Sequence, residues 1–156
     1  MTGTYAAAVH RILIGRVMAG AGALATIVGT FIPWVRSGTR RRSSYEIFSL
    51  VERLGFSPSS LVGWGLRLWP VVPFLLTLAV TLSWFPRRWV TDATALVAVL
   101  YVGGVAAAVE SAPSTSLVSI EFGPDVTLVG VVVFAGGALL SALRRPALDQ
   151  PFPNRQ

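Results

Sequence analysis

The side chains best suited to chemistry lie in one short stretch after the first apolar segment. Residues 36–42 read Arg-Ser-Gly-Thr-Arg-Arg-Arg, which brings together Arg36, Arg40, Arg41 and Arg42. Guanidinium groups bind phosphate and carboxylate through planar, paired hydrogen bonds. The cluster therefore predicts contact with a lipid phosphate headgroup or an acidic partner, the alternative being a solvated basic turn. No aromatic platform or DNA-binding motif accompanies it, which argues against nucleic acid as the partner.

Other kinds of reactive site are excluded by composition. The chain has no cysteine and one histidine, His10, so thiolate metal sites, cysteine nucleophiles and histidine metal pairs are ruled out. His10 has no acidic neighbour in the sequence, and no glycine loop of the phosphate-cradling type is present. We therefore expect no catalytic residue, no cofactor and no metal site, and a protein that is not an enzyme.

The composition itself indicates a membrane protein. The 156 residues suffice for one domain. Apolar residues make up 53% of the chain and charged residues only 13%, with a mean hydropathy of +0.66. Soluble domains carry about 25% charged residues. The formal net charge is +6, and every basic residue is arginine.

Four apolar stretches are long enough to cross a bilayer, which requires roughly 20 residues. They cover about residues 12–35, 69–85, 90–109 and 126–143. The helices of a soluble bundle keep one polar face, which these segments lack. The first stretch is also longer than the apolar region of a signal peptide, which favours a retained span. The predicted fold is an all-α membrane protein, with four transmembrane helices in a single domain over residues 1–156.

The loop predicted at residues 36–68 contains a short amphipathic helix, at about residues 44–54. Ser43 and Glu46 have the spacing of a capping box, and Gly55 suits the helix end. The predicted docking face of this helix consists of Ile47, Phe48, Leu50, Val51 and Leu54. Such a face binds the bilayer interface, the protein's own spans or another subunit.

The span ends carry tryptophans, which prefer the headgroup level of a bilayer. Trp34 ends the first span and Trp69 opens the second, so both are expected on one side. Trp84 and Trp89 bracket the opposite side. The sequence thus predicts an aromatic belt at both interfaces.

Arginines beside span ends favour a cytoplasmic location for both termini. The pairs Arg87–Arg88 and Arg144–Arg145 directly adjoin spans, whereas the six arginines of the first loop argue for the reverse orientation. In either orientation the first and third loops share a side. The arginine-rich loop then faces the acidic residues of the third loop, Glu110, Glu121 and Asp125, with which it can pair across a small cap.

Small residues at helical spacing predict where the spans pack against one another. The predicted packing face comprises Gly15, Ala19, Gly22, Ala23 and Thr26 in the first span, Gly103 and Ala107 in the third, and Gly137 and Ser141 in the fourth.

No expected span carries an ionisable residue at mid-depth. Arg16, Asp92 and Asp125 all lie near span ends, where snorkelling or helix capping accounts for them. Pumps and membrane enzymes usually place ionisable groups deep in the bilayer. Their absence here favours a role in assembly.

Three features of the chain match a known group of proteins: Phe31-Ile-Pro-Trp34, the Ser-Gly and Ser-Ser-Tyr-Glu segments that follow, and the turn Gly123-Pro124-Asp125. In these features the chain resembles small four-span membrane proteins of actinobacteria, of mycobacterial type. The resemblance implies a location in the bacterial inner membrane. Some proteins of this type are similar to accessory subunits of envelope machines such as the Mce lipid importers or the respiratory supercomplexes.

The resemblance implies a non-catalytic accessory subunit of a larger integral membrane complex, first of all an envelope lipid-transport assembly. A respiratory complex is the second host. The alternative is a stand-alone protein that binds or transports lipids, with anionic lipids held by the arginines.

Overall fold

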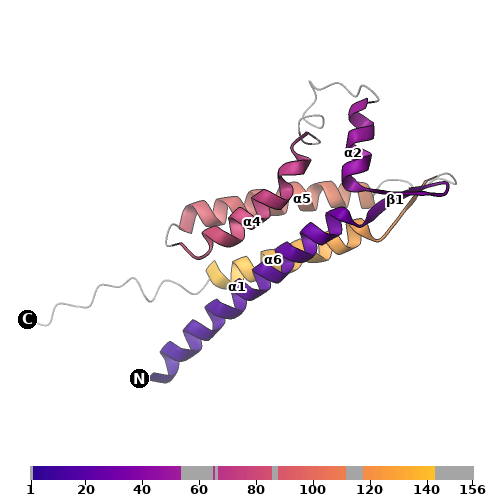
Figure 1. Ribbon diagram of the computed structural model, residues 1–156. Coiled ribbons are helices and arrows are strands. Elements are labelled where there is room, and N and C mark those ends of the chain that lie inside the picture. The colour runs from indigo at the N-terminus through magenta and orange to yellow at the C-terminus, as the bar shows by residue number, and fades with distance from the viewer. Residues whose placement is uncertain (1, 54–64, 66, 86–87, 112–117, 143–156) are drawn as a thin grey trace, which may run out of the picture.

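The computed structural model describes residues 2–53, 65, 67–85, 88–111 and 118–142, and is mainly helical with one small sheet (Figure 1). In chain order the elements are α1 (Thr2–Phe31), β1 (Pro33–Ser37), β2 (Arg40–Ser43), α2 (Ser44–Arg53), the 3-10 turn η1 (Trp69–Val71), α4 (Val72–Leu82), α5 (Arg88–Glu110), β3 (Val118–Ile120) and α6 (Gly123–Ala142). Helices α1 and α6 run side by side, α4 and α5 lie next to them, and α2 projects from the end that carries the sheet.

Three helical segments are long and apolar enough to cross a membrane: His10–Phe31, Trp89–Glu110 and Gly123–Ala142. They coincide with the first, third and fourth predicted spans. Their outer faces expose large apolar side chains such as Leu24, Leu100 and Val132, each more than half exposed. Apolar surface of this extent is typical of contact with lipid or another apolar surface.

The predicted second span, residues 69–85, takes a shorter form. Its apolar helix runs from Trp69 to Leu82 and joins a 3-10 turn of three residues to an α-helix of 11. That length corresponds to about 22 Å, below the roughly 30 Å of a hydrocarbon core. Pro70 and Pro73 lie in the first turns, where a residue without an N–H removes no helical hydrogen bond. A fourth span is therefore not shown.

The first predicted span also ends earlier than expected, at Phe31 instead of residue 35. Pro33 follows, and the residue before a proline is disfavoured in α conformation. Trp34 and Val35 then join the extended strand β1, since aromatic and β-branched side chains suit a strand.

A three-stranded antiparallel sheet replaces the irregular loop expected after the first span. Its strand order is β2-β1-β3, and Arg36 of β1 lies opposite both Arg41 of β2 and Ser119 of β3. The hairpin turns at Gly38, whose φ of 59° is one that side chains with a Cβ rarely adopt. Because β3 comes from the third loop, the prediction that the first and third loops share a side is confirmed.

Trp34 and Trp69 lie in the protein core rather than in a lipid-facing belt. Both are fully buried, and their rings meet edge to face at 5.4 Å. The Trp34 indole N–H donates to the Gly29 carbonyl and that of Trp69 to the Ser44 hydroxyl, each at 2.9 Å. They share one side as predicted, but protein acceptors satisfy the N–H groups that were expected to face the headgroups.

Trp84 and Trp89, in contrast, are exposed. The sequence pattern could not separate the two pairs, because all four tryptophans lie at the ends of apolar segments.

The closest helix contact joins α1 and α6. Glycines two turns apart on each helix meet the backbone of the other, and they are Gly15, Gly22 and Gly29 on α1 with Gly130 and Gly137 on α6. A Cβ added at Gly29 would lie 2.7 Å from the Thr127 nitrogen, well inside contact distance. The predicted residues Gly15, Ala19, Gly22, Ala23 and Thr26 are all buried, and Gly137 and Ser141 lie opposite them.

In α5 the buried face differs from the predicted one. The inward positions are Ala95, Ala98, Val102 and Ala106, whereas Ala107 is exposed. Gly103 lies beside Val131 of α6, at the margin of the contact. Every position from Gly103 to Ala108 is a small or β-branched residue, so residue type did not reveal which face is inward.

Candidate functional site

A groove of about 290 Å³ lies on the outer side of β2 and α2 and collects most of the predicted arginines. Its lining from β2 comprises Arg40, Arg41 and Arg42, and its lining from α2 comprises Glu46, Ser49, Leu50 and Arg53. We call this set the arginine groove. It offers four guanidinium groups against one carboxylate, a balance that attracts anionic ligands.

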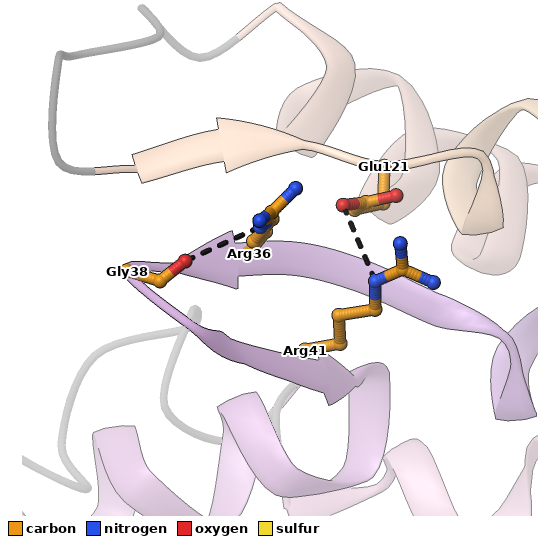
Figure 2. A network of polar contacts seen from close by, with 4 residues as sticks. All are labelled: Arg36, Gly38, Arg41 and Glu121. Atoms are coloured by element: carbon orange, nitrogen blue, oxygen red, sulfur yellow. Dashed lines mark hydrogen bonds and ion pairs between the residues drawn. The ribbon is translucent and has the colours of Figure 1, made fainter.

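The lining of the groove differs from the predicted cluster at two arginines. It includes Arg53, which was not predicted, and it lacks Arg36, which was. Arg36 is not part of the lining, and its Nε instead donates to the Gly38 carbonyl at 3.2 Å across the hairpin turn (Figure 2). Arg53 comes from the last turn of α2. The spacing of Glu46, Ser49 and Arg53 puts them on one helical face, which was the signal available for Arg53.

Arg41 connects the groove to the third loop. Its Nε lies 3.9 Å from an Oε of Glu121, just after β3, as Figure 2 shows. This pair confirms the expected contact between the basic first loop and the acidic third loop. The Arg41 side chain is 63% exposed, so the pair contributes about 0–1 kcal/mol. It orients the hairpin more than it stabilises the fold.

Glu46 and Arg42, which also line the groove, differ in their hydrogen bonding. The Glu46 carboxylate accepts the backbone N–H of Ser43 at 3.0 Å, which is half of the predicted capping box. The Arg42 Nε is buried, and no described residue accepts a hydrogen bond from it. A buried donor without an acceptor costs about 1–3 kcal/mol.

The apolar face predicted for α2 is divided between two surroundings. Phe48 packs on Trp69 with ring centroids 4.9 Å apart, and Ile47 also contacts the core. Leu50 is exposed and lines the arginine groove. Val51 lies in α2 but its side chain falls outside the described residues, as does Leu54. The predicted alternatives for this face were the bilayer interface, the protein's own spans or another subunit. Ile47 and Phe48 pack against the core of the protein itself.

Ser44 joins α2 to the helices below it. Its hydroxyl donates to the Thr30 carbonyl at 2.6 Å and accepts the Trp69 N–H. Trp69 in turn lies 5.9 Å from the Tyr101 ring of α5. This buried network, with Trp34 and Phe48, is called the aromatic junction. It holds the arginine groove in a set position over the helix ends.

Among the described residues, no group of three His, Cys, Asp or Glu side chains is placed to hold a metal ion. Comparison with protein-family models, with curated proteins and with solved structures gave no match for this chain.

Proposed function

We propose that this protein is a non-catalytic accessory subunit of a larger membrane complex and that the arginine groove docks an acidic segment of a neighbouring subunit. The observation that carries this proposal is the gathering of Arg40, Arg41, Arg42 and Arg53 around one groove. Arginine binds carboxylates through paired hydrogen bonds, and it is favoured at protein interfaces.

The contacts that hold the groove in place support a docking role. The aromatic junction fixes α2 through Trp69 and Ser44, both fully buried, and the pairing of β1 with β3 fixes the hairpin. A surface that is held in place before binding loses less conformational freedom when a partner docks.

For the embedded part we propose four crossings, with α4 completing the second. Helix α4 begins beside the aromatic junction and is followed by the exposed Trp84 and Phe85, suited to the far interface. Both termini then lie in the cytoplasm of a bacterial cell and the arginine groove lies outside.

Cysteine labelling tests this topology, because the chain has no native cysteine. A Thr39→Cys variant in the hairpin should react with an impermeant reagent in intact cells. A Phe85→Cys variant should react only after lysis. Reaction of both sites in intact cells would contradict the second crossing.

As the host we propose an actinobacterial envelope lipid-transport assembly, with a respiratory complex as the second candidate. The resemblance of the Phe31–Trp34 and Gly123–Asp125 segments supports this choice. The alternative is a stand-alone lipid-binding or lipid-transporting protein, because the arginine groove also suits an anionic lipid phosphate.

The docking role is tested by photo-crosslinking from the groove in native membranes. A photoreactive residue at Ser49 should form a discrete adduct with a larger membrane protein, and the same residue at Thr77, exposed on α4, is the matched control. Joint replacement of Arg40, Arg41, Arg42 and Arg53 by glutamine should remove the adduct. Replacement by lysine, which retains the charge but not the planar geometry, should weaken it.

The result separates the two functions. A protein that purifies in mild detergent as a lone monodisperse species, with no Ser49 adduct, would count against the subunit role. If anionic lipid copurifies with that lone species and is lost in the glutamine variant, the stand-alone lipid-binding role is favoured.

A further inference from the structure

A second cavity, of about 120 Å³, lies between α1, α4, α5 and α6, away from the sheet. Its charged and hydroxyl lining includes Arg16, Ser83, Asp92 and Ser141. We propose that this cavity binds the charged head of an amphiphile that carries both a phosphate and an ammonium group. The proposal is independent of the docking role of the arginine groove.

The location of the cavity follows from the packing of the bundle. The glycines of α1 and α6 bring these two helices into backbone contact, while alanines line the cavity, namely Ala79 of α4, Ala95 of α5 and Ala138 of α6 itself. Alanine side chains are too short to fill the space where α4 and α5 cross this pair. A cavity of roughly 150 Å³ is known to admit a benzene molecule, so the space here suits a small group or a short length of acyl chain.

The charged lining is balanced between one cation and one anion. Arg16 belongs to α1, and its guanidinium carbon lies 4.8 Å from the ring centroid of Trp84, which directs the group along that ring face. Asp92 belongs to the first turns of α5 and is exposed. A ligand with a phosphate alone meets Asp92 unfavourably, and a ligand with an amine alone meets Arg16 unfavourably.

The hydroxyl groups of the lining sharpen this preference. Ser83 donates its proton to the Val80 carbonyl at 2.6 Å, and Ser141 donates to the Gly137 carbonyl at 2.9 Å. With their protons used in this way, both oxygens face a ligand as acceptors. Together with Asp92 they match N–H donors, so a primary ammonium fits better than a quaternary one, which has none.

The remainder of the lining is apolar and includes Phe134 and Ala138. Chain carbons next to the head would contact this wall and leave water. Trp84 and Trp89, both exposed beside this end of α4 and α5, suit the interfacial depth at which a lipid head lies. The combined chemistry is that of an ethanolamine phospholipid.

Native mass spectrometry of the delipidated full chain in mild detergent tests the proposal. The ligands are lysolipids with the same chain and a phosphoethanolamine, phosphocholine or phosphoglycerol head. The ethanolamine form should bind up to about fivefold more tightly than the other two, because Asp92 is exposed and solvent-exposed charges pair weakly. Equal binding of the three would overturn the proposal.

Two variants assign the binding to this cavity. Asp92→Asn should remove the preference for ethanolamine over glycerol, and Ala138→Leu should lower the binding of all three lysolipids about tenfold by occupying the apolar wall. Asp125→Asn, at the sheet end of α6, and Gly136→Leu, beside open space, are the matched controls and should leave binding unchanged. Unchanged preference in Asp92→Asn would overturn the assignment even if Ala138→Leu fails to fold.

The source of the ligand is distinguished by repeating the measurement in nanodiscs with equal amounts of two-chain ethanolamine and glycerol phospholipids. Enrichment of the ethanolamine lipid on the extracted wild type, and not on Asp92→Asn, identifies a bilayer lipid. Selectivity toward free lysolipids without such enrichment identifies a single-chain ligand. Selectivity in neither format contradicts the proposal.

Discussion

The two sides of the helix bundle close in different ways. Between α1 and α6, glycines such as Gly22 and Gly137 let the backbones touch, and a Cβ at either would overlap the facing helix. Between this pair and the α4–α5 layer, alanines face one another and leave a cavity of about 120 Å³. Residues of nearly the same size therefore produce a tight seam on one side and a cavity on the other.

The α4–α5 layer is instead fixed at its sheet end. There Trp69 packs on Trp34 and Tyr101, and Ser44 accepts its N–H. The close contact of α1 with α6 is called the glycine seam and comprises Gly15, Gly22, Gly29, Gly130 and Gly137. The comparison indicates that the glycine seam supplies the close fit, that the aromatic junction positions the second layer, and that a cavity remains at the far end. Four comparisons of variants test this division.

The largest effect is expected in the glycine seam. Gly22→Leu forces α1 and α6 apart and should lower the free energy of unfolding by about 3 kcal/mol. Gly20→Leu, on the same helix but with open space around it, is the control and should change stability by less than about 0.5 kcal/mol. Unfolding in mixed micelles of mild detergent and dodecyl sulfate measures both. Equal losses of unfolding free energy in Gly22→Leu and Gly20→Leu would show that the glycine seam does not stabilise the fold.

The aromatic junction should respond next. Ser44→Ala removes the hydroxyl that bridges Thr30 and Trp69 and leaves a buried N–H and a buried carbonyl without that partner. We expect a loss of about 2 kcal/mol. Ser49→Ala, whose hydroxyl is exposed and bonds only within α2, serves as the comparison. A loss no greater than that of Ser49→Ala would show that the junction does not hold the second layer.

A smaller effect is expected at the cavity. Ala138→Leu enters existing space and should change the free energy of unfolding by less than about 1 kcal/mol. The neighbouring Gly137→Leu meets the α1 backbone and should lose about 3 kcal/mol. The same unfolding assay compares the two positions on one helix. Similar losses at both would mean that the two sides of α6 are packed equally tightly.

The smallest effect is expected at the surface of the sheet. Glu121→Gln removes the contact with Arg41 and should lower stability by less than about 1 kcal/mol at low salt. The difference in stability from wild type should vanish at about 1 M salt, because the Debye length is then roughly 3 Å and the exposed ion pair is screened. A difference that persists at high salt would point to a role for Glu121 other than this ion pair.

The features that the sequence predicted well depend on local interactions. The apolar segments of α1, α5 and α6 follow from composition within each segment, and the start of α2 follows from the local Ser43–Glu46 hydrogen bond. The arginines of residues 40–42 lie close together because they are adjacent in the chain. None of these features requires knowledge of what lies across the fold.

What only the tertiary structure decided involves residues distant in the chain. The pairing of β1 with β3 buried Trp34, the arrival of Trp69 gave its N–H a protein acceptor, and Arg36 was drawn to the hairpin turn while Arg53 joined the groove. The choice of Ala106 over Ala107 as the inward residue of α5 and the cavity that Ala95 of the same helix lines both depend on how helices of similar composition meet. Composition and spacing determine that a segment is apolar, basic or small-sided, but the partner of each face is determined by contacts that form only when the chain is folded.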